Sequence, residues 1–313
     1  MHQAYLKIES SSSLSAASQL VFLHIHKTGG LSLRNLILRS CRGQEHWDTG
    51  LGEVTRFEWE NYLKKLRELP PGELASHRLF LGHMPFGLHE VLPEKTRYVT
   101  FLRDPVKRMV SYFRMQHRRG LIPSLWAIDP SKPDWSLNDP RLLRALDNGQ
   151  TRLLAGVDSD LAFGQCNENH LRTAQANIDR HFDLVGSMES FSLSLALLRR
   201  IYGWKWHFYV PRNVAPPVDA KSTLAPEILE AIRRLNRFDL ELYHYAEQRL
   251  HEQAKDYGFS LRMDHRMFVS CNRMHQVVQK ARKAIKRRIV ESIAPVPATE
   301  SQSPSPLSQE SAS

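Results

Sequence analysis

The stretch Val21-Phe-Leu-His-Ile-His-Lys-Thr-Gly-Gly-Leu-Ser-Leu33 decides the fold class of this chain. Its apolar start predicts a short buried strand, the segment 27–30 predicts a turn, and a helix is expected from about Leu31. Two glycines at a strand-to-helix turn let backbone amides approach an anion closely. The helix N-terminus adds a partial positive charge, and the Lys27 ammonium adds a full one. The stretch therefore predicts a binding site for a phosphate or a sulfonate.

The residue order in this turn differs from that of the nucleotide-hydrolase loop. That loop reads Gly-x-x-x-x-Gly-Lys-Ser/Thr, with its lysine after the last glycine. Here Lys27 precedes both Gly29 and Gly30. The sequence also offers no convincing aspartate for holding magnesium. A nucleotide kinase or hydrolase, which would use ATP with magnesium, is an alternative that these two features oppose.

A second segment, Tyr98-Val-Thr-Phe-Leu-Arg-Asp-Pro-Val-Lys-Arg-Met-Val-Ser-Tyr112, has the same order of strand, turn and helix. Residues 99–102 are the apolar run of a buried strand, and Pro105 suits the first helical turn after Asp104 as a cap. Arg103 leaves the end of the strand, and Ser111 lies two turns into the helix. Since arginine offers a fork of donors that matches phosphate oxygens, this turn predicts a second anion contact.

Together the two segments resemble the nucleotide-binding elements of sulfotransferases that use 3′-phosphoadenosine-5′-phosphosulfate (PAPS), and the likeness extends over residues 20–250. It is a likeness to carbohydrate-modifying enzymes of the heparan sulfate 2-O and 6-O type. It implies that the lysine-glycine turn holds the 5′-phosphosulfate and that Arg103 and Ser111 hold the 3′-phosphate. The family usually has Thr where Leu31 stands, so a backbone amide remains there but a hydroxyl is missing. The cofactor-binding residues so implied are Lys27, Thr28, Gly29, Gly30, Leu31, Ser32, Leu33, Arg103, Ser111, Arg152 and Arg212.

Two residues are expected to carry the chemistry. Sulfuryl transfer builds charge on the bridging oxygen of the leaving phosphate, and Lys27 is the cation that can stabilise it. His83 follows an expected strand, and an imidazole can take the acceptor proton near neutral pH. The resemblance supports this role, because polysaccharide sulfotransferases of this group carry a catalytic histidine in a similar context. Neither task needs a metal, so no metal site is expected, and His24 and His26 are expected to pack or to support the site.

Strands that alternate with helices predict an α/β protein with a P-loop-like three-layer fold, in which helices cover both faces of a central, mainly parallel sheet. Strands are expected at residues 20–25, 78–81, 97–102, 182–186 and 204–210, and helices at 33–39, 57–68, 105–119, 191–202 and 226–255. Ligands of such sheets lie beyond the carboxyl ends of the strands. Lys27, His83 and Arg103 all follow expected strand ends, so we expect them to share one pocket.

The chain has 313 residues, 42% of them hydrophobic, which is enough for one sizeable domain. We expect a flexible leader at residues 1–18, the domain at 19–262, a basic amphipathic helix at 263–293 and a disordered tail at 294–313. The net charge of +10 favours anionic partners, although a nucleic acid is not expected among them. Three widely spaced cysteines, and the lack of an apolar leader or span in the sequence, predict a cytoplasmic protein with an optional peripheral membrane contact.

Residues 273–289 combine an apolar stripe with many basic residues. The pattern is typical of helices that contact an anionic membrane surface or an acidic partner. A solvated helix docked on the domain is the alternative. The stripe consists of Met274, Val277, Val278, Ala281, Ile285 and Ile289.

The expected function is in-line sulfuryl transfer from PAPS to an acceptor hydroxyl, with His83 as the general base and a carbohydrate as the expected acceptor. A non-catalytic glycan- or membrane-binding protein on the same fold is the remaining alternative. It predicts binding without nucleotide and no effect of His83→Ala. Acceptor choice is expected to lie in a loop at residues 121–140 and in the basic helix end at 114–119.

Overall fold

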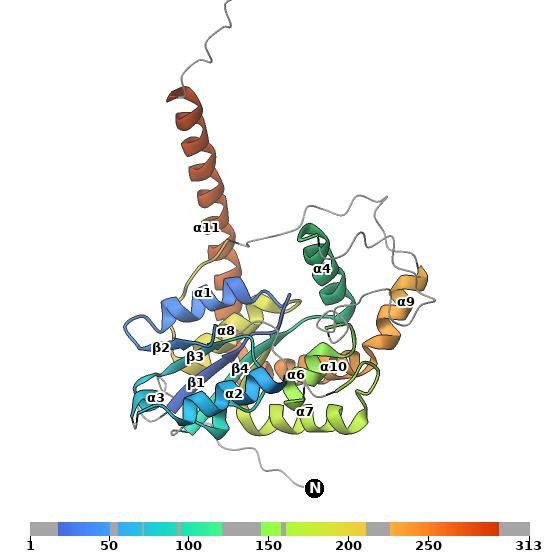
Figure 1. The fold of residues 1–313 in the computed structure, drawn as a ribbon. Coiled ribbons are helices and arrows are strands. Elements are labelled where there is room, and N and C mark those ends of the chain that lie inside the picture. The colour runs from blue at the N-terminus through green and yellow to red at the C-terminus, as the bar shows by residue number, and fades with distance from the viewer. Residues whose placement is uncertain are drawn as a thin grey trace, which may run out of the picture.

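The centre of the computed structural model is a five-stranded sheet whose paired strands are parallel (Figure 1). The structure describes residues 18–50, 56–70, 72–92, 95–120, 145–157, 161–210 and 226–293. The strands are β1 (Ser18–Leu23), β2 (His46–Asp48), β3 (Leu79–Gly82), β4 (Lys95–Leu102) and β5 (Phe182–Ser187), in the order β2-β3-β1-β4-β5. β1 lies in the middle, where Phe22 is level with Leu81 of β3 and Val99 of β4.

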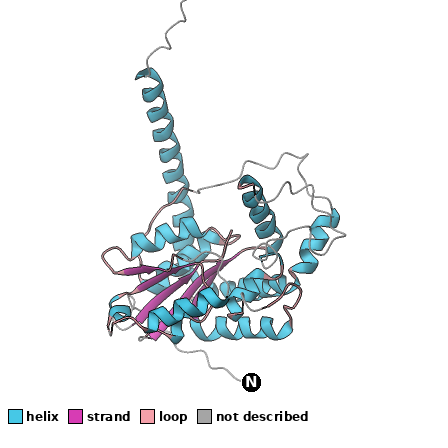
Figure 2. Cartoon of the chain, viewed as in Figure 1, coloured by secondary structure: helices cyan, strands magenta, loops and turns pink. Residues whose placement is uncertain are grey.

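Helices cover both faces of this sheet, as Figures 1 and 2 show. Those in the described part of the chain are α1 (Gly30–Ser40), α2 (Arg56–Arg67), α3 (Glu73–Ser76), α4 (Pro105–Arg118), α6 (Gly149–Ala155), α7 (Glu168–His181), α8 (Phe191–Tyr202), α9 (Pro226–Leu235), α10 (Arg237–Asp256) and α11 (Gly258–Ile293), with a 3-10 turn η1 at Leu88–Glu90. This arrangement confirms the expected three-layer α/β fold.

Two hydrophobic cores separate the layers, because side chains alternate between the faces of a strand. Leu20 and Phe22 of β1 join the core formed with α1, α8 and α11. Val21 and Leu23 join the core formed with α2, α7 and α10. Burial on both faces explains why the strands read as continuous apolar runs rather than as alternating ones.

A third core holds α4 beside the sheet. Met109 and Phe113 of α4 pack with Ile228 and Ile232 of α9. The start of α4 agrees with the sequence-based expectation: the Asp104 carboxylate accepts a hydrogen bond from the Lys107 amide at 2.9 Å, and a proline occupies the first turn. The packing fixes the face that α4 presents to the turn after β1.

The expected strand at residues 204–210 is not formed. Gly203 adopts the left-handed conformation that ends α8. The following residues place their aromatic side chains against the helices, and the Trp206 ring stacks on Phe268 of α11 with a centroid separation of 4.7 Å. The alternation of aromatic residues that favoured a strand therefore reflects side-chain packing rather than backbone pairing.

The helices differ from expectation in several places, since the short helices α3 and α6 were not expected and two further regions are changed. The single helix expected at residues 226–255 is divided at Asn236, whose side chain donates back to the Ile232 carbonyl and ends α9. α7 was not anticipated at all. Its start is marked by a capping box, in which the Asn167 side chain accepts from helix amides and the Asn167 amide donates to His170.

The last helix, α11, begins at Gly258 and extends away from the rest of the chain (Figure 1). Within the described residues, no helix is both long enough and apolar enough to cross a membrane. The division into leader, domain, basic helix and tail stays a prediction. Residues 1–17, the loop at 121–140, the segment with Arg212 and the tail at 294–313 lie outside the described residues.

Candidate functional site

The turn between β1 and α1 is held in an unusual backbone conformation. Lys27 has φ +70° and Gly29 has φ +77°, both in the left-handed region. Each glycine is also needed for space: a Cβ on Gly29 would lie 2.2 Å from the Met188 sulfur, and one on Gly30 would lie 1.5 Å from His24 Nε2. The two glycines therefore let the chain turn tightly between the end of β5 and the first imidazole.

The N-terminus of α1 points its first amides out of the helix. Gly29 is the N-cap and makes no side-chain capping bond. The amides of Ser32 and Leu33 already donate to the Gly29 carbonyl, at 3.0 and 3.2 Å. Gly30 and Leu31 are thus the positions whose amides suit an anion, because the first amides of a helix have no partner within it.

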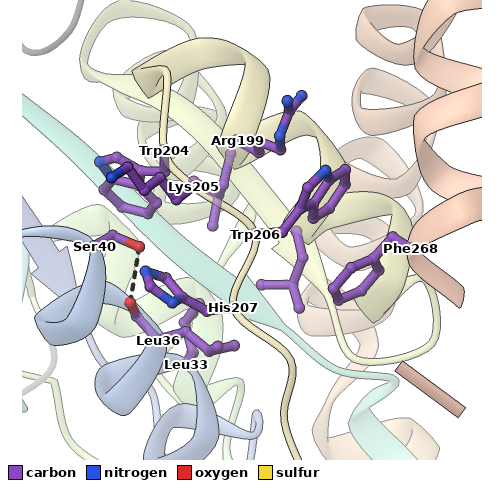
Figure 3. Close-up of a pocket in the computed structure, with 11 residues that line it drawn as sticks. Leu33, Leu36, Ser40, Arg199, Trp204, Lys205, Trp206, His207 and Phe268 are labelled. Carbon is purple, nitrogen blue, oxygen red and sulfur yellow. Dashed lines mark hydrogen bonds between the residues drawn. The ribbon is translucent and has the colours of Figure 1, made fainter. Parts of the chain in front are cut away.

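The side chains of two predicted cofactor-binding residues also have structural roles. The Thr28 hydroxyl is buried and donates to the Ile25 carbonyl at 2.8 Å, which closes the turn. The Leu33 side chain is fully buried and lines an apolar pocket between α1, α8, the segment 204–207 and α11 (Figure 3). In Figure 3 Trp206 and Phe268 lie side by side on its wall. Apart from Leu33, this pocket contains none of the predicted site residues.

Lys27 is half-buried among other cations. Its Nζ lies 3.9 Å from the sulfur of Met115 on α4. Burial lowers the pKa of Lys27, and the nearby Arg118, Arg103 and Arg119 guanidinium groups lower it further. Like charges gathered in a partly desolvated place repel one another, so an anion bound here would be strongly favoured.

Arg103 joins the two turns that the sequence singled out. Its Nη1 donates to the Lys27 carbonyl at 3.1 Å. Its backbone is held by Gln150, whose side chain accepts from the Arg103 amide and donates to the Arg103 carbonyl, both at 3.0 Å. Its Nε is buried without a hydrogen-bond partner in the described part of the chain. A buried guanidinium donor without a partner fits a phosphate oxygen.

Ser111 lies on the same face of α4 as Met115, one helical turn earlier, because residues four apart are neighbours on a helix surface. Since Met115 contacts Lys27, Ser111 is directed toward the same turn. Its side chain is half-buried. The structure thus brings Lys27, Arg103 and Ser111 to one edge of the sheet, beyond the carboxyl ends of β1 and β4.

His83 follows β3 and forms the middle of a stack of three imidazoles. Its ring lies over His26 with a centroid separation of 3.7 Å and over His24 at 4.0 Å. Its Nδ1 lies 2.7 Å from the His24 carbonyl oxygen. A carbonyl can only accept, so Nδ1 carries the proton and Nε2 is left as the basic atom.

The three imidazoles are held neutral by burial. Desolvation lowers the pKa of His24 to about 3 and that of His26 to about 2, with a smaller contribution from His83 in each case. Desolvation also lowers the pKa of His83, against the hydrogen bond to the His24 carbonyl, which raises it. A neutral His83 with its lone pair on Nε2 is the form that a general base requires.

Stacked rings direct their nitrogens outward around the stack rather than toward one shared point. In agreement with this geometry, the described residues contain no group of three His, Cys, Asp or Glu side chains that could hold a metal ion.

Arg152 is not placed to contact a ligand. Its side chain is fully buried, Nε and Nη2 bond the Asp147 backbone and carboxylate, and the remaining bonds go to the Leu161 and Ala162 carbonyls. The sequence expectation of a phosphate contact at Arg152 is therefore corrected: its guanidinium holds the chain around α6. Arg212, the other outlying prediction, falls outside the described residues.

A buried polar network, which sequence reasoning missed, sets the position of Gln150. The Asp239 carboxylate of α10 accepts from the amides of Gln150 and Thr151 and from the Thr151 hydroxyl. It also faces the buried Arg108 guanidinium of α4 at 3.5 Å. No local pattern in the sequence shows that residues 148–154 and 236–243 bind each other.

Comparison with curated proteins finds carbohydrate and glycolipid sulfotransferases. The chain is 26% identical over 248 residues to galactose-3-O-sulfotransferase 2 of Sus scrofa, which covers 73% of the chain and 60% of the relative. It is 26% identical over 261 residues to galactosylceramide sulfotransferase of Bos taurus, covering 76% and 58%. Heparan-sulfate 6-O-sulfotransferase 2 of Danio rerio matches at 26% over 282 residues, covering 72% and 57%. The chain thus spans less than two thirds of the length of these relatives.

These relatives correct one expectation. They are Golgi-type sulfotransferases, so the cytoplasmic location expected from the cysteine spacing and the leader is wrong. Widely spaced cysteines fit any protein that does without disulfides, and therefore do not identify a compartment. The resemblance to carbohydrate sulfotransferases, by contrast, is confirmed by the same relatives.

A family model described as galactose-3-O-sulfotransferase matches residues 6–292. The match includes the turns at Lys27 and Arg103, His83 and the whole of the central sheet. The chain therefore belongs to the galactose-3-O-sulfotransferase family.

Proposed function

We propose that this protein transfers the sulfuryl group of PAPS to a hydroxyl of a galactose-containing carbohydrate or glycolipid. The observation that carries the proposal is the meeting of two anion-binding turns, through the bond from Arg103 to the Lys27 carbonyl, beside a neutral imidazole. The family and the names of the relatives support the choice of reaction and of acceptor class.

The residues present fit a bisphosphorylated donor. The amides at the N-terminus of α1 and the Lys27 ammonium suit the 5′-phosphosulfate, while the Arg103 Nε and the Ser111 hydroxyl suit the 3′-phosphate. Lys27 adds a desolvated positive charge where negative charge develops on the leaving oxygen. The donor supplies the sulfuryl group, and the S–O bond to phosphate breaks as the bond to the acceptor oxygen forms.

In this scheme His83 acts as the general base and accepts one proton. Its Nδ1 is committed to the His24 carbonyl, so Nε2 receives the proton of the acceptor hydroxyl. Because burial keeps the ring neutral, His83 needs no prior deprotonation at neutral pH. The ring packing on both faces fixes the direction of Nε2.

The acceptor assignment is tested by measuring transfer of radiolabelled sulfate from PAPS to three substrates: galactosylceramide, an oligosaccharide with terminal galactose, and desulfated heparan. We expect transfer to one or both galactose acceptors, and a loss of at least a hundredfold in His83→Gln. The matched control is His251→Gln, a substitution at an exposed position of α10, which should leave the rate unchanged. Full activity in His83→Gln, or transfer only to heparan, would contradict the proposal.

A peripheral contact between residues 273–289 and an anionic membrane or acidic partner remains a prediction alongside this one. This contact would be made by the surface of α11. α11 is distant in sequence from the turns at Lys27 and Arg103 and contacts α8 and α10.

A further inference from the structure

The two faces of α11 differ in what they contact. One face is buried against the domain: Leu261 and Phe268 are 1% and 2% exposed, and Asn272 accepts a hydrogen bond from the Tyr209 amide at 2.8 Å. Asp264 on the same side pairs with Arg199 and Arg200 of α8. These contacts anchor the first half of the helix.

The other face carries large apolar side chains that remain exposed. Each of them exposes between 43% and 70% of its surface. Apart from the adjacent Val277 and Val278, successive members lie three, four or seven residues apart, which places them on one side of an α-helix. The exposed stripe consists of Phe259, Met263, Met267, Met274, Val277, Val278 and Ile285.

This stripe is longer than the sequence pattern indicated. It begins at Phe259, next to the anchored part of α11, and continues into the part that projects from the domain (Figure 1). The stripe spans residues 259–285, which at 1.5 Å per residue is about 40 Å of helix, and a contiguous exposed apolar surface of this kind is typical of an interaction site.

The charge of α11 identifies what can cover the stripe. Its acidic residues are Asp264, which is already paired, and Glu291. Its basic residues are Arg262, Arg266, Arg273, Lys280, Arg282, Lys283, Lys286, Arg287 and Arg288. Two copies of such a helix would repel each other, whereas an anionic lipid surface attracts the basic residues and accepts the apolar ones.

We propose that α11 docks the protein on an anionic lipid bilayer, with the stripe from Phe259 to Ile285 inserted at the level of the headgroups. The helix lies in the plane of the membrane surface and holds the domain beside it through Leu261, Phe268 and Asn272. This inference does not depend on the proposed reaction, because it concerns only the exposed face of α11.

Co-sedimentation of the full chain with vesicles tests the docking. Vesicles of phosphatidylcholine alone are compared with vesicles containing about one third phosphatidylserine. We expect the protein to bind the anionic vesicles at least tenfold more tightly, and the triple variant Met274→Ser, Val277→Ser and Val278→Ser to lose that binding by at least tenfold. These three side chains are exposed on the face of α11 opposite the one that docks on the domain, so the fold and the binding of 3′,5′-adenosine bisphosphate should be retained.

Two control variants on α2 test whether vesicle binding depends on the stripe itself. They change an exposed apolar side chain and exposed positive charges elsewhere on the protein. Phe57→Ser removes an apolar side chain that is 73% exposed, and Lys64→Glu with Lys65→Glu reverses exposed charges away from α11. Neither should change vesicle binding, whereas Lys280→Glu with Lys283→Glu should weaken it. The proposal is overturned if the wild type ignores anionic vesicles, or if it forms a lipid-free dimer that the triple serine variant dissociates, because a second copy would then cover the stripe.

Discussion

His83 illustrates at the residue scale how neighbours determine what a side chain can do. In the sequence it is one of fifteen histidines, and only its position after a strand distinguished it. In the structure His24 and His26 sandwich it, and the His24 carbonyl fixes its tautomer. The sequence could place His83 at the end of a strand, and therefore at the edge of the sheet where the turn at Lys27 also lies. It could not predict the stack, because nothing in a sequence shows which rings meet face to face.

The buried imidazoles predict a pH dependence of stability. The folded-state pKa values of His24 and His26 lie at about 3 and about 2, below the ordinary 6.5. Well below pH 6.5, and above the folded-state values, the unfolded chain therefore binds two protons that the folded chain does not. The free energy of unfolding should decrease as the pH is lowered, by about 3 kcal/mol per pH unit from these two groups.

Urea denaturation between pH 6.5 and pH 5 measures this dependence. In His26→Leu the slope should decrease by about 1.4 kcal/mol per pH unit, since one proton is no longer excluded. Equal slopes in the wild type and in His26→Leu would mean that His26 is not held neutral.

At the scale of elements, four of the five strands and several of the helices followed from local patterns, whereas the short strand β2 and the helices α3, α6 and α7 did not. β1, β3, β4 and β5 are short apolar runs bounded by turn residues, which periodicity detects. Aromatic and other residues alternate along 204–210 as they would in a strand. In the structure this alternation instead places Trp206 against Phe268. The capping pair Asn167 and His170 at the start of α7 involves a histidine, which the usual capping pattern does not include.

The contact between α6 and α10 predicts a large cost for one substitution. Asp239 is fully buried and faces the buried Arg108 guanidinium. Asp239→Ala would leave that charge unpaired and three donors without an acceptor, so we expect a loss of about 3–5 kcal/mol in the free energy of unfolding. Glu241→Ala, on an exposed position of the same helix, should cost less than about 0.5 kcal/mol. Urea denaturation of both variants checks the difference, and similar losses would contradict the network.

The whole molecule carries a net charge of +10, and part of that charge surrounds Lys27. Binding of a small polyanion should therefore weaken as salt is added, because screening reduces the attraction between separated charges. We expect the Kd for 3′,5′-adenosine bisphosphate to rise several-fold between about 0.05 M and 0.3 M sodium chloride. A Kd that is independent of salt would show that the surrounding arginines do not contribute.

At the scale of the whole molecule, the net charge predicted anionic partners. The cysteine spacing and the leader predicted the wrong cellular location. Net charge acts over the whole surface, so it favours a nucleotide, an acidic glycan and a lipid surface alike. The family match and the geometry of particular turns were needed to choose among them. The exposed stripe of α11 was visible as a sequence pattern from Met274 onward, but its extension to Phe259 depends on which face docks on the domain.

The central claim is that the turns at Lys27 and Arg103 form a site for a donor nucleotide with a 3′-phosphate. Isothermal calorimetry of 3′,5′-adenosine bisphosphate without metal, beside ATP with magnesium, tests it most directly. The account predicts preferential binding of the bisphosphate, at least tenfold weaker in Lys27→Ala and unchanged in Lys64→Ala on the exposed face of α2. Preference for magnesium ATP, or binding of neither nucleotide, would contradict it.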